Sequence, residues 1–385
     1  MSSRGTGIST GISTGINHPA LHLGREVVNE LGAGPLAHSD DHRAQTAHTL
    51  LVNTDLSIAD VAITSGFSSI RQFTATMQSV YETTPTALRG QSAGSTATRQ
   101  PSGSATAITL RLPARPPFDG VGLFAFFLAH AVKGMETAGA SSFARAVRLP
   151  GGVAEIELRL DEPYAITCTA RVDDIADLSP LISLVRRLLD LDADSAAIDA
   201  SLSADVTLAP LVATRPGIRL PGSLDIEETL FRTMIGQQVS VAAATTVIGR
   251  LASELSATPG LFPTAVEIAE SAPGVVRGPA TRVASILAVA RAIANGSLTL
   301  DVGLPADEFS ARLTAMPGIG PWTAGYLAMR VLGNPDVLLA SDLVMLASAS
   351  RLGLPSTARS LAAHGARWAP WRSYAGLHLW SAAGR

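Results

Sequence analysis

Apolar residues recur three and four positions apart through the second half of the chain, which is the spacing of one helix face. From about Asp205 onward this pattern predicts helices only. The helix-length segments are Ser223–Met234, Gly236–Leu255 and residues 264–271, 279–295 and 307–316. After a Pro317-Gly318-Ile319-Gly320 turn, a further helix starts at Pro321 and runs to about Leu332, before a Gly-Asn-Pro break.

Residues 105–183 have a different pattern, in which polar and apolar positions alternate over short runs. Ile108–Leu112 alternates strictly and predicts a strand, and further strands are expected near 143–149, 153–160 and 165–172. Helices are expected from Val121 to about Gly134 and over Leu178–Leu191. This segment is therefore predicted to be a small α+β domain, to which we assign a packing role.

The N-terminal region contains a pair of short helices joined by a tight turn. Helices are also expected over residues 18–37 and 43–52, and a cap signature at Ser57-Ile-Ala-Asp60 starts the first of the pair. Gly66 makes the turn, and Ser69-Ile-Arg-Gln72 is a capping-box signature that starts the second. The predicted buried stripe of this second helix is Ile70, Phe73, Met77 and Val80, with Arg71 and Gln72 facing outward.

These patterns predict a multidomain α+β protein that is mainly α-helical. Residues 1–17 repeat Gly-Ile-Ser-Thr and are expected to be disordered, and 91–104 reads as a flexible linker. Between and after them we expect three domains. They are a helix-turn-helix domain (18–90), a small α+β domain (105–183) and an all-α domain (184–385).

Composition narrows the class of protein. The chain has 385 residues, of which 46% are hydrophobic, and its single cysteine, Cys168, excludes a disulfide framework and a cysteine zinc site. We find no signal peptide and no uninterrupted apolar span of membrane length, so a cytoplasmic location is expected. Net charge is −3, but residues 311–385 contain seven arginines and two acids, a local excess of five positive charges. That local excess favours a polyanionic partner.

The stretch from Pro317 to Asp342 concentrates the candidate chemistry. Gly318 and Gly320 form a turn that opens a helix, and such a turn presents free amides to an anion such as phosphate. Trp322 and Tyr326 are four residues apart and so share one helix face. Asp342 precedes Leu-Val-Met-Leu and is expected to open another helix. Taken singly, core packing of the aromatics and an N-cap role for Asp342 are the ordinary interpretations.

Together these residues resemble the hairpin and catalytic aspartate of the helix-hairpin-helix DNA glycosylase superfamily, and within it the 3-methyladenine DNA glycosylase II family. Further motifs of that family occur in the same order over roughly residues 105–385. They are Met135–Thr137, Phe143–Arg145, Arg215–Gly222, Ile235–Val241, Trp371–Tyr374 and Leu377–Trp380. The absence of cluster cysteines argues against the iron–sulfur members of the superfamily.

The resemblance implies an enzyme that flips an alkylated base out of double-stranded DNA and hydrolyses its glycosidic bond. Gly318 and Gly320 would bind phosphate through their amides, where a monovalent cation is also possible, and Gln238 stands at the position of the family's leucine plug. Aromatic faces attract cations by about 0.5–2 kcal/mol. A base pocket of Trp322, Tyr326 and Trp380 would therefore favour positively charged bases.

Asp342 would be the catalytic residue, because its carboxylate stabilises the positive charge that develops on the sugar. Relatives with lyase activity carry a lysine at the position of Trp322, so the resemblance implies a monofunctional enzyme. We expect no cofactor and no metal, and a monomer.

Ala59–Ala62, Gly66-Phe67, Gln72-Phe73 and Thr84-Pro85 resemble the second helix-turn-helix of AraC-type regulators, and Leu31–Leu36 resembles the adaptive-response alkylation regulator. The resemblance makes Arg71 and Gln72 candidate DNA-binding residues. It is partial, because the first helix-turn-helix is reduced to its last helix and the cysteine-dependent methyl-accepting domain is lacking. Two alternatives therefore stay open: a DNA-binding regulator with little or no glycosylase activity, and a mismatch or oxidised-guanine glycosylase.

Overall fold

The computed structural model describes residues 43–44, 46–48, 50–52, 56–91, 100–101, 106–272 and 274–383. The chain divides into two compact units, one made of residues 1–51 and 58–91, the other of 52–57 and 92–385. The predictions for residues 1–17 and 18–37, and for most of the 91–104 linker, lie outside the described residues.

The first unit is helical, as predicted. The described positions between 43 and 52 are helical, and they precede α3 (Ile58–Thr64), α4 (Ile70–Tyr81) and α5 (Pro85–Gln91). In α4, Phe73 and Met77 are buried, but Ile70 and Val80 are 49% and 39% exposed. The predicted stripe of four buried residues is therefore wrong at both ends, because a unit this small covers only the middle of the helix.

The start of α4 also differs from the predicted capping box. The Ser69 hydroxyl accepts a hydrogen bond from the Gln72 amide, as a capping residue does. The Gln72 side chain does not return this bond to Ser69. Its Oε1 instead accepts from the Ser68 amide and the Ser68 hydroxyl, at 3.3 and 2.8 Å.

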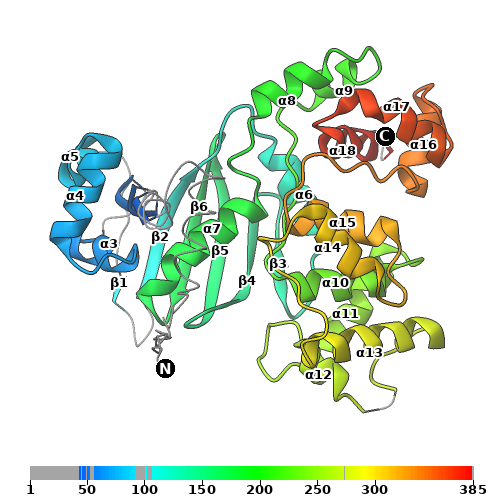
Figure 1. Cartoon of the computed structure of the whole chain (residues 1–385), viewed down its shortest axis with the longest axis horizontal. Helices are drawn as coiled ribbons and strands as arrows, with labels where there is room; N and C mark the ends of the chain where they lie inside the picture. Colours follow the sequence, from blue (N-terminus) through cyan, green and yellow to red (C-terminus); the bar gives the residue numbers. More distant parts are fainter. Residues whose placement is uncertain are drawn as a thin grey trace, which may run out of the picture. The chain divides into compact units, whose positions relative to one another are not determined.

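The second unit begins with an antiparallel sheet in the order β1-β2-β6-β5-β4-β3 (Figure 1). Its strands are β1 (Gln100–Pro101), β2 (Thr106–Pro113), β3 (Glu136–Ala138), β4 (Ser142–Leu149), β5 (Gly152–Glu162) and β6 (Ala165–Val172). Buried and exposed residues alternate along β4 and β5, so one face of the sheet is covered.

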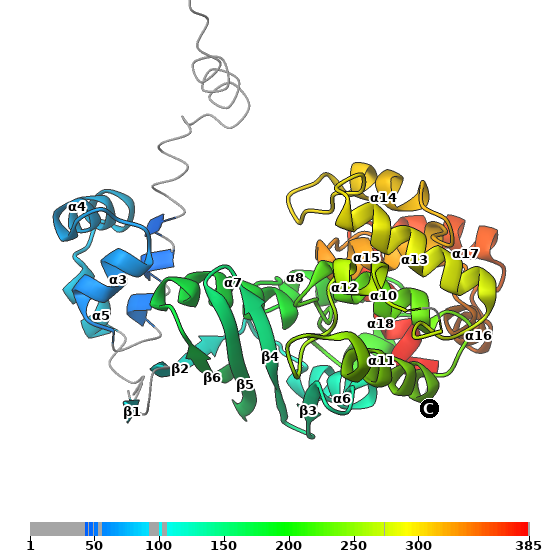
Figure 2. The same ribbon diagram turned by 90° about the horizontal axis from the view of Figure 1, so that it is seen from below.

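Two helices join this sheet to the rest of the unit. α7 (Leu178–Leu188) lies across one face of the sheet (Figures 1 and 2), and the predicted boundary at 183/184 falls inside it. α6 (Gly120–His130) packs against β3, β4 and α11. The predicted helix to Gly134 ends earlier, and the short strand β3 was not predicted, because three residues give no readable alternation.

From α7 onward the described residues contain helices and no strand, as predicted. The helices are α8 (Ser195–Leu202), α9 (Ala209–Thr214), α10 (Ile226–Gly236), α11 (Val241–Leu255), α12 (Ala265–Ala269), α13 (Ala280–Ala294), α14 (Ala306–Thr314), α15 (Pro321–Val331), α16 (Leu343–Arg351), α17 (Ala358–Gly365) and α18 (Arg372–Ala383). None of the helices in the described ranges has the length and apolar character needed to cross a membrane.

These helices build two hydrophobic cores that meet at α15. One core is formed mainly by α10 to α14 and includes Leu327 of α15. The other is formed by α8, α9 and α16 to α18 and includes Met329 of α15. In Figure 1, α15 lies between these two groups of helices. Its remaining face, which carries Trp322 and Tyr326, is only partly buried and is free to line a site.

Candidate DNA glycosylase active site

The hairpin between α14 and α15 has the geometry of an anion site. Gly318 has a φ of +79°, and a Cβ there would lie 2.7 Å from the Ser285 Cβ, so both conformation and space require glycine. Gly320 caps α15 with an ordinary φ of −95° and open space around it, so only the first glycine needs the left-handed region. Both residues are exposed, and their amides make no backbone hydrogen bond within the described part of the chain.

Asp342 is the N-cap of α16, and its carboxylate also receives two indole N–H groups. Oδ1 accepts from the Met345 amide and from Trp380 Nε1, each at 2.9 Å. Oδ2 accepts from Trp322 Nε1 at 3.2 Å. The cap fixes the carboxylate against the start of α16, and the two tryptophans, from α15 and α18, each donate to a different oxygen of it. Asp342, Trp322 and Trp380 are thus brought together, as the sequence predicted.

One face of α15 carries Trp322, Tyr326 and Arg330 at successive turns. The rings of Trp322 and Tyr326 are stacked, with centroids 5.2 Å apart and planes 6° apart. Arg330 Nη1 donates to the Tyr326 hydroxyl at 2.5 Å, and its Cζ lies 5.4 Å from the centre of the Tyr326 ring. Trp322 and Tyr326 together with Asp342 border a cavity of about 790 Å³.

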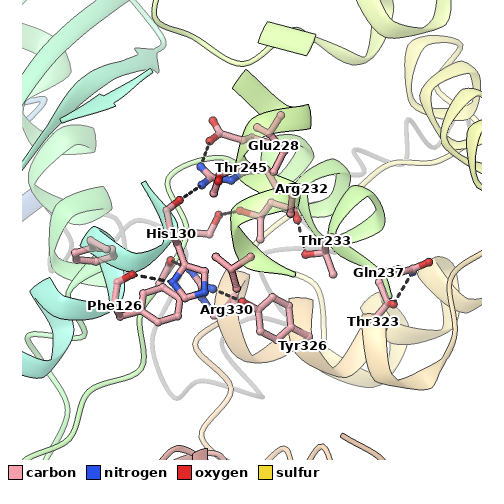
Figure 3. A pocket seen from close by; sticks show the side chains of 18 of the residues that line it. Phe126, His130, Glu228, Arg232, Thr233, Gln237, Thr245, Thr323, Tyr326 and Arg330 are labelled. Atoms are coloured by element: carbon pink, nitrogen blue, oxygen red, sulfur yellow. Dashed lines mark hydrogen bonds and ion pairs between the residues drawn. The ribbon is translucent and has the colours of Figure 1, made fainter. Parts of the chain in front are cut away.

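The opposite wall of this cavity comes from the α+β domain, which the sequence analysis had credited with packing alone. Phe126 and His130, four residues apart on α6, line it (Figure 3). Their rings stack with centroids 4.1 Å apart, and His130 Nδ1 lies 2.8 Å from the Phe126 carbonyl oxygen. A carbonyl only accepts, so Nδ1 carries the proton. Burial, together with the charges of Arg330 and Arg232, lowers the pKa of His130 and keeps the ring neutral.

A buried ion cluster joins the α+β domain to α10 at the edge of the same cavity. Arg145 pairs with Glu136 at 2.9 Å and with Glu228 at 2.7 Å. Arg232 pairs with the same two carboxylates, at 2.7 and 2.8 Å. Burial alone would raise the pKa of Glu228, but the two arginines outweigh it and lower that pKa to about 2. The cluster is charge-balanced and holds α10 in place.

The loop between α10 and α11 carries Gln238 in a left-handed conformation, with a φ of +60°. This is uncommon for a residue other than glycine and indicates that neighbouring contacts hold it. Arg282 donates to the carbonyls of Ile235 and Gln237, at 3.3 and 2.5 Å. Gln237 Nε2 donates to the Gly318 carbonyl at 3.1 Å and to Thr323 Oγ1 at 3.2 Å. The loop and the hairpin are therefore tied to each other directly.

The predicted site residues of the second unit fall into three groups. Asp342, Trp322, Tyr326 and Gln238 line the cavity. Trp380 is not among the lining residues, but its indole N–H donates to the Asp342 carboxylate. Gly318 and Gly320 do not line the cavity either, and Gly318 accepts a hydrogen bond from the lining residue Gln237.

Arg71 and Gln72 belong to α4 of the first unit. Arg71 is exposed, whereas Gln72 is partly buried and bonded to Ser68. The sequence analysis missed Phe126, His130 and Arg330. Their spacing could have indicated them, because residues four apart share one helix face. Phe126 and His130 are four apart, and so are Tyr326 and Arg330.

Comparison with known proteins identifies the family. Residues 109–225 match the AlkA N-terminal domain, and residues 16–91 match a helix-turn-helix domain. A Mycobacterium tuberculosis protein, described as a probable bifunctional transcriptional activator/DNA repair enzyme AlkA, is 41% identical over 93% of this chain and 73% of its own length. This chain belongs to the AlkA family of DNA glycosylases.

A further relative agrees with that assignment, and a solved structure shares the fold. Escherichia coli DNA-3-methyladenine glycosylase 2 is 30% identical over 69% of this chain and 94% of its own length. The structure of 3-methyladenine DNA-glycosylase from Archaeoglobus fulgidus superimposes with a TM-score of 0.62, at 19% identity, over 71% of this chain and 98% of that one. The latter shows a shared fold. This AlkA relative is therefore a DNA repair glycosylase joined to a helix-turn-helix domain of the AraC type.

Proposed function

We propose that this glycosylase removes alkylated bases, including 3-methyladenine and 7-methylguanine, from double-stranded DNA and leaves an abasic site. The single observation that carries the proposal is the Asp342 carboxylate, held by two indole N–H groups at the border of an aromatic cavity. A carboxylate so placed meets the sugar of a base that occupies the cavity.

The exposed amides of the hairpin would anchor the DNA backbone, which holds the duplex without reading sequence. Gln238 would fill the gap left by the flipped nucleotide. Its backbone is left-handed, and the preceding residue, Gln237, is bonded to Arg282 and to Gly318; this anchoring of the loop supports the role because a wedge must stay rigid when the stack opens.

Asp342 would act on the positive charge that develops at C1′ as the glycosidic bond lengthens. The bonding electron pair leaves with the base, which neutralises an alkylated, cationic base. Water supplies hydroxide to C1′ and releases a proton to solvent.

The enzyme would be monofunctional, because a Schiff base requires an amine. The chain has one lysine, Lys133, which is exposed and is not among the residues lining the cavity.

The test is release of base from methylated duplex DNA by the full chain. We expect free 3-methyladenine and 7-methylguanine, with strands that stay intact until alkali cleaves the abasic sites. Absence of release by folded protein would reject the proposal. Strand cleavage without alkali, or borohydride trapping through a residue of the cavity, would reject monofunctionality.

A second function, regulation through DNA binding by the first unit, is favoured by one observation. The Ser69-capped helix α4 exposes Arg71, as the helix that enters the major groove would. Salt-dependent binding of undamaged duplex tests it. Arg71→Ala should weaken that binding without changing base release, and an unchanged affinity would count against a role for this helix.

A further inference from the structure

The cavity contains a resident cation, Arg330, at the end of α15 away from Asp342. Trp322 and Arg330 are eight residues apart, which is about 12 Å along a helix. The Arg330 guanidinium lies between two aromatic rings, 4.8 Å from the centre of Phe126 and 5.4 Å from that of Tyr326. The aromatic faces at this end of the cavity thus already have a cation.

The three hydrogen bonds of Arg330 within the described part of the chain go to uncharged oxygens. They are the carbonyls of Pro221 and Gly222 and the hydroxyl of Tyr326. Arg145 and Arg232, which line the same cavity, are instead paired with glutamates. Arg330 therefore keeps its charge without a carboxylate among these partners.

The cavity is polarised as a result, with the Asp342 carboxylate at one end and the Arg330 guanidinium towards the other. A flipped nucleotide whose sugar meets Asp342 directs its base along the face of α15, past Tyr326 towards Arg330. This placement rests on the proposed function.

The charge of Arg330 acts differently on two kinds of damaged base. When the glycosidic bond breaks, its electron pair goes to the base. An alkylated, cationic base becomes neutral, so a nearby positive charge weakens its binding and assists its departure by similar amounts, and the two effects cancel in the overall rate constant from free enzyme and DNA. A neutral damaged base, such as hypoxanthine, becomes an anion unless it gains a proton, and a fixed positive charge stabilises that anion.

We propose that Arg330 is a specificity-determining residue that stabilises the leaving base electrostatically and so extends the glycosylase to uncharged damaged bases. The neighbouring His130 does not offer a competing route by protonation. Its Nδ1 proton is directed at the Phe126 carbonyl, and its ring is neutral, which leaves Nε2 without a proton to give.

The experiment compares two duplexes that differ only in the target base, 7-methylguanine or hypoxanthine, in single turnovers with the full chain below saturation. The second-order rate constant measured in this way includes the binding of the base. The neutral variant is Arg330→Gln, which keeps a side-chain N–H donor for the carbonyls, and Arg330→Lys is the charge-matched control. We expect R330Q to lower hypoxanthine release by about 100-fold. It should change 7-methylguanine release by about threefold or less, and R330K should keep the ratio of the two rates near that of wild type.

Equal fractional losses for both bases in a folded R330Q protein would overturn the proposal, because a structural role affects both substrates alike. Release of 7-methylguanine but not hypoxanthine by the wild type would also overturn it. Release of neither base by the wild type would instead reject the proposed function.

A second pair of variants covers the case in which R330Q does not fold. His130→Glu adds a carboxylate beside Arg330 without touching its carbonyl bonds, and His130→Gln is the uncharged control. The added charge should lower the ratio of hypoxanthine release to 7-methylguanine release about tenfold relative to the same ratio in H130Q. A ratio identical in these two variants would contradict the electrostatic role.

Discussion

Replacing Asp342 with asparagine separates the two roles that this residue combines. Asn caps helices as well as Asp does, so the bond from the Met345 amide should persist. The amide nitrogen then faces one indole N–H, and the loss of that bond costs about 1 kcal/mol. Alanine removes the cap, about 1 kcal/mol, and leaves the indoles of Trp322 and Trp380 without their acceptor, so its total cost is about 2–3 kcal/mol.

The rate of base release should depend on the negative charge at position 342 and not on whether the side chain there caps α16. Both variants lack the carboxylate that acts on the sugar, so we expect each to slow base release at least 100-fold, about 2.7 kcal/mol of transition-state stabilisation. The assay is single-turnover release from a duplex with one 7-methylguanine, alongside thermal unfolding and binding to an abasic duplex. Asp342→Asn should bind nearly as wild type does.

Two results would refute this reasoning. Release by Asp342→Asn within tenfold of wild type would show that the negative charge is not needed. A variant pair in which activity falls in proportion to the melting temperature would show that Asp342 contributes only the helix cap.

Four more predictions follow from other parts of the chain. Trp322→Ala should slow release of 7-methylguanine more than release of hypoxanthine, because only a cation also loses the electrostatic attraction of the ring; equal losses would leave Trp322 a shape element. A chain starting at Ala105 should keep base release, since the second unit contains the cavity, and a soluble but inactive product would contradict this. Gln237→Leu should weaken DNA binding and base flipping, because it removes the hydrogen bond from the α10–α11 loop to the Gly318 carbonyl of the hairpin. The fluorescence of 2-aminopurine placed beside the lesion reports flipping, and unchanged fluorescence would argue against a role for this bond. Burial, with the charge of Arg215, lowers the pKa of His378 to about 4, so protonation favours the unfolded chain below pH 6.5. Wild type should therefore lose about 3 kcal/mol between pH 6.5 and 4 that His378→Phe does not lose, and parallel pH profiles of urea unfolding would refute it.

The sequence predicted most helices and four of the six strands of the sheet, because their patterns are regular over five or more residues. Alternation over Ile108–Leu112 and periodicity from Asp205 onward predicted the elements that are observed there. β3 was missed because a strand of three residues leaves no pattern. Ile70 and Val80 were wrongly expected to be buried, since spacing identifies a helix face but does not say how far a neighbour covers it.

Some residues of the candidate site could likewise be predicted from local patterns, and others could not. The motif between Pro317 and Asp342 predicted Asp342, Trp322 and Tyr326 as site residues, and the structure places them in contact. Phe126 and His130 are nearly two hundred residues before Trp322 in the sequence, on the small α+β domain to which we assigned a packing role. Their place in the cavity depends on α6 meeting α11 and the sheet, a tertiary contact that no local pattern encodes.

The helix cap and the proposed chemistry of Asp342 are not alternatives, and this explains why the sequence alone could not decide between them. A carboxylate on a flexible loop would have to be ordered when the substrate binds, at a cost in entropy. As the N-cap of α16, it has its first oxygen fixed by the Met345 amide before any DNA arrives. The indoles of Trp322 and Trp380 then fix its plane, because each donates to a different oxygen. The same bonds that start the helix therefore pre-orient the charge, which is the condition under which a fixed dipole or ion lowers a barrier most.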